Sequence, residues 1–375
     1  MSLATQSSTG LSHQSSLLQY SGSISNGQMH GNGELLYPNG ERYSGSWVHG
    51  KRHGTGTYFY ADGGRYEGQW TDDKINGIGV AHYANGNRYE GEFEFGVLHG
   101  SGILFFADGD KYEGSFSRGQ MNGKGVYTYA NGDSYDGEWL NDRRNGKGTV
   151  TYVDEDGSVI EKFSGDFVDG VFHGFGVYHY ADGGVYEGMW EKGTMSGKGT
   201  FVFPNGNRYE GQFENDLKQG QGVLYYVNGE KYTGSWINDV AHGNGELIFG
   251  GGDRYVGEFV SAKKHGQGEL HYSNGDVYKG EWQDDRANGY GSLDYSSGEK
   301  YEGEWRNDKR EGFGVFSAAN GERYEGEFKD GRRHGKGKVF LTGGHVLIGR
   351  FVDGLLGGNI EFQFQPSCTW SNPDI

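Results

Sequence analysis

The sequence has few of the features that identify secreted and membrane proteins. Its 375 residues include one cysteine, Cys368, and four prolines. A single cysteine excludes an internal disulfide framework, so we expect an intracellular protein. The first residues, MSLATQSSTG, lack the basic and apolar regions of a secretory signal. No apolar run approaches the 18 residues that a membrane-spanning helix needs.

Positive charge is also scarce. The chain has 34 Lys and Arg residues against 51 Asp and Glu residues, which gives a net charge of −17. Nucleic acids and anionic lipid surfaces attract basic proteins and repel acidic ones. We therefore expect no nucleic-acid partner, and the charge argues against general binding to anionic lipid.

Glycine, in contrast, is abundant, with 73 residues. Such a content is typical of collagen or of low-complexity chains. Collagen needs glycine at every third position, and the spacing here is different. A disordered chain lacks apolar surface, whereas 15% of these residues are aromatic. The composition therefore favours a folded, glycine-rich repeat protein.

An aromatic residue recurs with a period of 23 residues, and we call it the lead aromatic. The series is Tyr20, Tyr43, Tyr66, Tyr89, Tyr112, Tyr135, Phe163, Tyr186, Tyr209, Tyr232, Tyr255, Tyr278, Tyr301 and Tyr324, with Leu347 in the last place. One step is 28 residues long because five residues are inserted near 154–162. The fifteen repeats cover roughly residues 20–369. A serine-rich segment, 1–19, which we expect to be flexible, and a tail, 370–375, lie outside them, so no separate catalytic domain is expected.

Each repeat predicts two strands joined by tight turns. Alternate residues of a strand point to opposite faces, so Tyr66, Gly68 and Trp70 share one face. The second strand is expected to begin after Gly77-x-Gly79 and to carry Tyr83. A glycine follows the lead aromatic by two residues in every repeat, which indicates that an aromatic ring lies across the bare backbone. One hairpin alone buries too little surface to fold, so stability should come from neighbouring repeats.

The pattern Y-x-G-x-[WF] followed by [HN]-G-x-G resembles the MORN repeat (membrane occupation and recognition nexus). The resemblance depends on Y-E-G-Q-W and N-G-I-G within residues 66–79 and on their parallels along the chain. The predicted fold class is all-β: an elongated, single-layer antiparallel meander of about 15 stacked two-stranded hairpins, a ribbon like a β-solenoid.

Several residue patterns suggest chemistry, and each has a simpler explanation. Seven histidines stand directly before the G-x-G motif of their repeat: His30, His53, His99, His173, His242, His265 and His334. Equivalent residues of adjacent repeats lie about 10 Å apart, too far for a shared zinc ion, so we favour a hydrogen bond that stabilises a turn. Glu67, Glu90 and Glu113 alternate with basic residues as a solvated ladder. We expect no catalytic residue, metal or cofactor.

Three sets of residues are candidates for partner contact. The first is a set of aromatic residues whose main role is packing: Trp47, Trp70, Trp139, Trp190, Trp236, Trp282 and Trp305. The second is an apolar edge formed at the tips of the links: Met29, Ile75, Leu98, Met121, Phe172 and Met195. The third is a basic zone that could meet anionic lipid: Lys263, Lys264, Lys309, Arg310, Arg332 and Arg333. Ordinary solvated tips are the alternative interpretation for the last two sets.

The resemblance implies a non-enzymatic scaffold. Family members built almost wholly of repeats serve in protists as cytoskeletal scaffolds at basal, cortical or flagellum-associated structures, and they form antiparallel homodimers. Two alternatives are a component of the radial spokes in the axoneme of motile cilia and a peripheral protein that binds phosphoinositides. The expected partners are therefore proteins of a cytoskeletal or axonemal assembly, and the expected location is the cytoplasm or cytoskeleton, including a cilium or flagellum.

Overall fold

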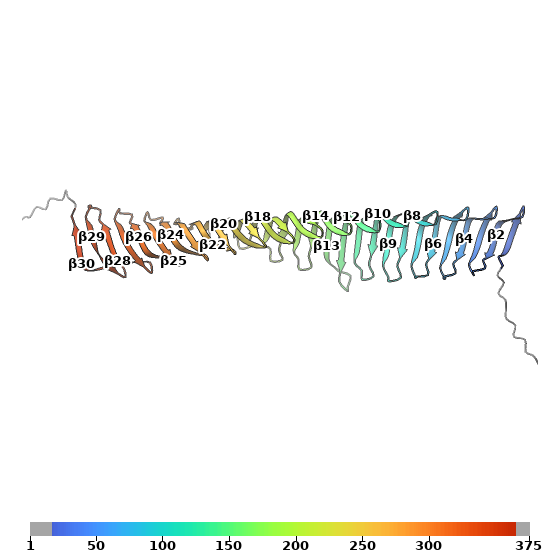
Figure 1. Ribbon diagram of the computed structural model, residues 1–375, viewed down its shortest axis with the longest axis horizontal. Coiled ribbons are helices and arrows are strands. Elements are labelled where there is room, and N and C mark those ends of the chain that lie inside the picture. Colours follow the sequence, from blue (N-terminus) through green and yellow to red (C-terminus); the bar gives the residue numbers. More distant parts are fainter. Residues whose placement is uncertain (1–16, 365–375) are drawn as a thin grey trace, which may run out of the picture. The chain divides into compact units, whose positions relative to one another are not determined.

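A computed structural model describes residues 17–364, which contain thirty β-strands and no helix (Figure 1). The chain divides after Ala181 into two compact units, and each is described by itself. The expected flexible segment 1–19 and the tail 370–375 lie almost wholly outside the described residues.

The first unit contains fourteen strands. They are β1 (Gln19–Ser25), β2 (Gln28–Leu36), β3 (Arg42–Val48), β4 (Lys51–Phe59), β5 (Arg65–Thr71), β6 (Lys74–His82), β7 (Arg88–Glu94), β8 (Val97–Phe105), β9 (Lys111–Ser117), β10 (Gln120–Thr128), β11 (Ser134–Leu140), β12 (Arg143–Val153), β13 (Val159–Val168) and β14 (Val171–His179). Each of the strands β1 to β13 pairs antiparallel with the next strand along the chain.

The second unit contains sixteen strands. They are β15 (Val185–Glu191), β16 (Thr194–Val202), β17 (Arg208–Glu214), β18 (Leu217–Tyr225), β19 (Lys231–Ile237), β20 (Val240–Ile248), β21 (Arg254–Val260), β22 (Lys263–His271), β23 (Val277–Gln283), β24 (Arg286–Asp294), β25 (Lys300–Arg306), β26 (Lys309–Ser317), β27 (Arg323–Lys329), β28 (Arg332–Phe340), β29 (Val346–Val352) and β30 (Leu355–Gln363). Consecutive strands again pair antiparallel. The predicted all-β antiparallel meander of two-stranded hairpins is confirmed within each unit.

Two kinds of turn alternate along each meander. Asp72 and Asp73, between β5 and β6, have φ of 49° and 71°, the two positive values of a tight type I′ hairpin turn. The other turn has three residues. The Tyr60 nitrogen donates to the Gly64 carbonyl oxygen over 2.9 Å, and Gly63 takes a φ of 92°. These turns are the expected ones.

The second strand of each repeat begins earlier than the sequence suggested. Strand β6 starts at Lys74 and ends at His82, so Gly77 and Gly79 lie inside it and Tyr83 follows it. Between the Gly68–Gly79 and Trp70–Ile75 pairs, β6 has two more residues than β5. The first glycine of the motif therefore belongs to a bulge rather than to a turn.

The core of each unit lies on one face of its sheet, which we call the aromatic face. It carries the lead aromatics, the Trp or Phe four residues later, and the residues that pair with them across the strands. The lead tyrosines Tyr43, Tyr89 and Tyr112 are 0% exposed. The opposite face, the polar face, carries residues such as Glu67 and Gln69.

The insertion lengthens two strands rather than a turn. Strands β12 and β13 have 11 and 10 residues, and Tyr152 pairs with Glu161 beyond the usual hairpin end. Asp154 closes the same three-residue turn, because its nitrogen donates to the Ser158 oxygen over 3.0 Å. The hairpin extends past its neighbours in the first unit (Figure 1). Val159 at its tip is exposed.

Candidate interaction faces

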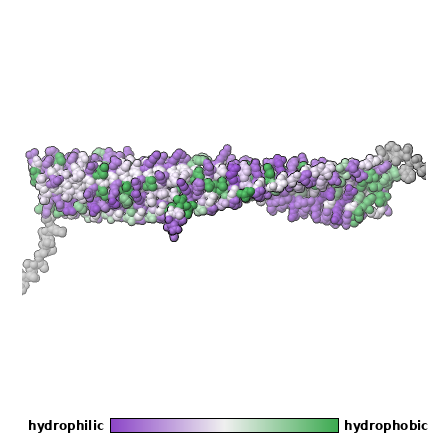
Figure 2. All heavy atoms as spheres, turned by 180° about the vertical axis from the view of Figure 1, so that it is seen from behind, coloured by the Kyte–Doolittle hydropathy of each residue, from purple (hydrophilic) through white to green (hydrophobic). Residues whose placement is uncertain are grey.

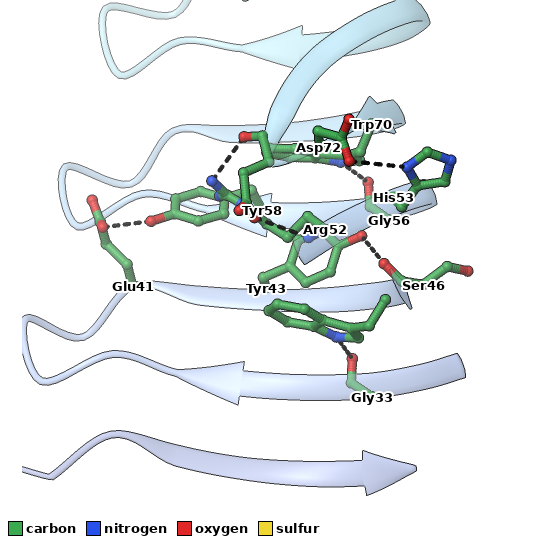
Figure 3. Close-up of polar contacts among 12 residues, drawn as sticks. Gly33, Glu41, Tyr43, Ser46, Arg52, His53, Gly56, Tyr58, Trp70 and Asp72 are labelled. Atoms are coloured by element: carbon green, nitrogen blue, oxygen red, sulfur yellow. Dashed lines mark hydrogen bonds and ion pairs between the residues drawn. The ribbon is translucent and has the colours of Figure 1, made fainter. Parts of the chain in front are cut away.

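The lead tyrosine of each repeat lies across a pair of facing glycines. In repeat 2, Gly45 pairs with Gly56, and a Cβ added to Gly45 would lie 2.5 Å from the Tyr43 hydroxyl oxygen. The hydroxyl donates to the Ser46 carbonyl oxygen over 3.0 Å (Figure 3). Burial raises the pKa of Tyr43 to about 12, against a weaker lowering by Arg52. The expected contact between ring and bare backbone is thus confirmed.

The tryptophans connect each repeat to the one before it. The Trp70 indole nitrogen donates to the Gly56 carbonyl oxygen over 3.1 Å, and Trp47 reaches Gly33 over the same distance (Figure 3). The bond recurs at Trp139, Trp236, Trp282 and Trp305 over 3.0–3.3 Å. All seven predicted tryptophans are 2–8% exposed. Their packing role is plain, and contact with a partner stays a prediction that their burial makes secondary.

The six apolar residues expected along an edge lie elsewhere. Ile75 pairs with Trp70 and Leu98 with Phe93. Met121, Phe172 and Met195 likewise pair with an aromatic residue, whereas Met29 pairs with Ile24. Their side chains are half-buried or buried on the aromatic face. The edge position was wrong because the strand begins before Gly77, which brings these residues beside the aromatic rings. Partner contact by this set remains a prediction.

In some repeats the position equivalent to Ile75 holds Lys or Arg, and its cationic group then stacks on aromatic rings. The Arg52 guanidinium carbon lies 4.4 Å from the Trp70 ring centroid and 5.1 Å from that of Tyr58 (Figure 3). Lys264 lies 4.4 Å from Trp282, and burial lowers the pKa of its amine. These basic residues therefore take part in the core of the sheet.

The predicted basic zone accordingly splits into two groups. Lys264, Arg310 and Arg333 stack on aromatic rings. Lys263 and Lys309 form ion pairs with Asp284 and Asp330 over 3.5 and 3.1 Å, and Arg332 is exposed. Only the second group is placed to meet an external anion, and lipid contact remains untested.

Aspartates in the two-residue turns form hydrogen bonds to the repeat before them, and we call this connection the clasp. The sequence analysis missed it. The Arg52 backbone nitrogen donates to the Asp73 carboxylate over 2.9 Å, while the Asp73 backbone nitrogen donates to the Arg52 carbonyl oxygen over 3.0 Å. The carboxylate bond recurs at Asp142, Asp216, Asp239, Asp285 and Asp308. The sequence contained a sign of these bonds, because some repeats have Asp and others have Gly at this turn position.

The polar face carries the expected charge ladder. Lys111 pairs with Glu113 over 2.8 Å, Arg323 with Glu325 over 2.8 Å, and Arg88 with Glu90. The side chains of these pairs are partly exposed to solvent, so each pair contributes little to stability.

A second set of carboxylates on the polar face supports the bulges. The Glu92 carboxylate accepts a 2.9 Å hydrogen bond from the Ser101 backbone nitrogen. The Glu258 carboxylate accepts in the same way from the Gln267 nitrogen over 3.0 Å. These side chains therefore provide acceptors for backbone donors at the interrupted part of the ladder.

The predicted turn bonds before the glycine pair occur with amide and carboxylate side chains. The Asn76 oxygen accepts from the Phe95 nitrogen over 3.4 Å, and the Gln219 oxygen accepts from Asn238 over 3.0 Å. Among the histidines, His99 lies 3.4 Å from the Glu94 carboxylate and His53 lies 4.0 Å from the Asp72 carboxylate. Within residues 17–364, no cluster of potential ligands could hold a metal ion, and no helix has the length and apolar character to cross a membrane.

The final hairpin departs from the pattern, as its sequence suggested. Leu347 replaces the lead tyrosine, and Ile360 stands where a glycine is expected. The register between β29 and β30 is interrupted beside Gly349. Val352, Leu355 and Ile360 are exposed, and apolar residues gather near this end of the second unit in Figure 2.

A family model described as the MORN repeat matches the chain fourteen times in succession, over residues 20–157 and 163–344. The fifteenth hairpin, β29 and β30, lies beyond these matches. The comparison with curated proteins finds no significant match.

Among solved structures, the chain is similar to the TCP10 domain of Danio rerio CPAP, at 11% identity and a TM-score of 0.30, over 54% of this chain and 89% of that one. The same domain in complex with a peptide of Danio rerio STIL gives 11% identity and a TM-score of 0.34, over 65% and 95%. The Drosophila melanogaster SAS-4 TCP domain, in complex with a proline-rich motif of Ana2, gives 16% identity and a TM-score of 0.27, over 40% of this chain and 81% of that one. These scores are too low to support an argument about this chain.

Proposed function

This chain belongs to the MORN repeat family, and we propose that it is a non-enzymatic scaffold that holds proteins together at a cytoskeletal structure, whether basal, cortical or flagellum-associated. Repeats of this family mediate protein or membrane interactions. The observation that carries the proposal is the extent of the repeats, since matches cover residues 20–157 and 163–344. A chain of this kind presents the same pair of faces many times, which suits it to binding along its length.

We further propose that the scaffold is a homodimer that associates through β30. In the part of the chain that the structure describes, β30 pairs with β29 alone. An open strand edge offers unpaired backbone groups to another chain. Leu355 and Ile360 on this strand are 76% and 52% exposed. Substitution of both by Lys should leave a monomer in sedimentation analysis, and an unchanged dimer would contradict this interface.

The test of the scaffold proposal is detergent extraction of cells that carry a tagged copy, imaged before and after. Retention of the signal on a discrete insoluble structure is expected. The position of that structure distinguishes a basal or cortical scaffold from the alternative, a component of the axoneme of motile cilia. Loss of the signal with the membrane fraction would contradict the scaffold and favour phosphoinositide binding.

A further inference from the structure

A tyrosine ring fills a fixed space on the aromatic face of repeat 2. The Tyr58 ring centroid lies 5.8 Å from that of Tyr37, 4.8 Å from that of Tyr60 and 6.0 Å from that of Trp70. Its hydroxyl donates to the Glu41 carboxylate over 2.6 Å (Figure 3). Three aromatic walls and one carboxylate therefore enclose this ring.

Repeat 5 builds the same enclosure. The Tyr127 ring lies 5.6 Å from Phe106, 4.7 Å from Tyr129 and 5.9 Å from Trp139. Its hydroxyl donates to Asp110 over 2.6 Å. The agreement between the two repeats shows that the enclosure accepts a phenol ring in a reproducible position.

Repeat 3 has the enclosure without the ring. Ala81 stands at the position of Tyr58, and Gly64 stands at that of Glu41. The walls remain, because Tyr60, Tyr83 and Phe93 occupy the positions of Tyr37, Tyr60 and Trp70. The other fourteen hairpins have Tyr, Phe, Leu or Val at the Ala81 position. Only repeat 3 has an alanine there.

The result is a hollow of about 240 Å³ in the first unit, lined by Tyr60, Tyr66, Phe93, Ala81 and Tyr83 among others. Ala81 is buried at its floor with 6% exposed, whereas Tyr60 and Tyr83 are 39% and 42% exposed. Aromatic rings pack edge-to-face or offset with centroids about 4.5–7 Å apart, which is the spacing found around Tyr58. The hollow thus offers an aromatic side chain the same neighbours.

The charge of the lining selects among the chains that could supply such a ring. Asp62 lines the hollow and is exposed. His82 also borders the hollow, but it pairs with Arg65 across the strands, and its imidazole lies 3.1 Å from the Arg65 guanidinium on the polar face. No Lys or Arg is among the described residues of the lining. A basic residue beside the incoming ring would therefore complement Asp62.

We propose that the hollow at Ala81 binds one Phe or Tyr side chain from a basic segment of a partner protein. The proposal depends on the scaffold function and gives it a specific contact. The partner supplies the ring that repeats 2 and 5 supply for themselves, and its Lys or Arg pairs with the Asp62 carboxylate. The hollow would then act as the anchor pocket of a larger interface.

The probe is the peptide Gly-Lys-Phe-Lys-Gly carrying 4-fluorophenylalanine, titrated against the full chain and followed by fluorine NMR. We expect saturable binding in the millimolar range, as suits one anchor residue. Ala81→Tyr fills the hollow with the chain's own ring and should weaken binding at least ~tenfold. The matched control is Leu104→Tyr, which introduces a tyrosine at the equivalent position of the next repeat. It should leave binding unchanged.

Thermal melting checks that Ala81→Tyr folds, which is expected because it installs the residue that repeats 2 and 5 already have. Equal binding by Ala81→Tyr and by the native chain would overturn the site, as would the absence of saturable binding to the native chain. Equal binding of a peptide with Glu in place of both Lys residues would overturn the role of Asp62. Detergent retention of the native chain is measured separately, so a failure of this site leaves the scaffold proposal standing and the reverse also holds.

Discussion

The indole nitrogen of Trp70 donates a 3.1 Å hydrogen bond to the carbonyl oxygen of Gly56 in the preceding repeat. The same glycine lies under the Tyr43 ring of its own repeat. One backbone unit is therefore held from two sides, by an aromatic residue of its own repeat and by one of the next. This arrangement predicts that each repeat depends on its neighbours for stability.

Substitution of Gly56 tests the contact with Tyr43. A methyl group at this position would overlap the Tyr43 ring, so Gly56→Ala should destabilise the first unit by about 1–3 kcal/mol. The control is Gly251→Ala, because an added Cβ there meets no atom within 4 Å. Urea unfolding of the two variants measures the difference. Equal midpoints would show that the ring moves aside without cost.

Substitution of Trp70 separates its hydrogen bond from its packing. Trp70→Phe keeps a ring, as in Phe93 of the next repeat, but removes the donor to Gly56, so a loss of about 1–2 kcal/mol is expected. Trp70→Ala should cost about 3–5 kcal/mol, because it also empties the core. If chemical denaturation gave the two variants the same stability, the bond and the ring would not contribute as described.

The clasp at Asp73 is tested by the residue that stands in its place in other repeats. Asp73→Gly keeps a turn that accepts positive φ but removes the carboxylate that accepts from the Arg52 nitrogen. We expect a loss of about 0.5–1.5 kcal/mol and faster exchange of the Arg52 amide. The control is Asp72→Gly at the neighbouring turn position. Unchanged exchange at Arg52 would contradict the clasp.

Alkaline pH should unfold the chain. Burial raises the pKa of Tyr43, Tyr66 and Tyr112 to about 12, from an ordinary value of 10. A raised pKa means that the folded state holds these protons more tightly than the unfolded state. Their contribution is fully present below pH 10 and is lost as the pH rises to about 12.

Circular dichroism between about pH 9 and pH 12.5, with tyrosinate absorbance followed in parallel, should show ionisation and unfolding together. Ionisation of these tyrosines well before unfolding would contradict their burial.

The basic residues of the second unit should separate into structural and exposed groups. Arg310→Ala removes a cation from the rings of Tyr301 and Phe328 and should lower stability by about 0.5–2 kcal/mol. Arg332→Ala should leave stability within about 0.5 kcal/mol, because the side chain is exposed. Thermal melting of the two variants measures the difference, and equal losses would show that stacking on the rings does not matter.

The lipid alternative requires a different variant from the one that the sequence suggests. Replacing Lys263, Lys309 and Arg332 removes charge without disturbing the rings. Sedimentation with phosphoinositide vesicles should be unaffected by this triple change if the chain is a protein scaffold. A marked loss of vesicle binding would support lipid contact instead.

Much of this architecture follows from the sequence. The 23-residue period predicted the hairpins, and the glycine after each lead aromatic predicted the ring over bare backbone. Both are local consequences of strand alternation, as with Tyr66, Gly68 and Trp70. The bulge was missed because Gly77 resembles a turn glycine, and the start of β6 was therefore placed too late. That single error moved Ile75 and its equivalents from the aromatic face to an edge.

Other features could not be predicted because they depend on contacts between repeats. The clasp at Asp73 requires the position of the Arg52 nitrogen, 21 residues earlier. The hollow at Ala81 requires knowledge of which rings surround Tyr58. In both cases the sequence shows the substitution but not the neighbours that give it meaning.

The most direct test of the account is native-state hydrogen exchange, measured by mass spectrometry on the native chain and on Gly56→Ala. If each repeat completes the core of its neighbours, the variant should lose protection in its own hairpin, β3 and β4, and in the next hairpin, β5 and β6. The second unit should be unchanged. Loss of protection confined to β4 would contradict the account, because it would show that the repeats are stable independently of one another.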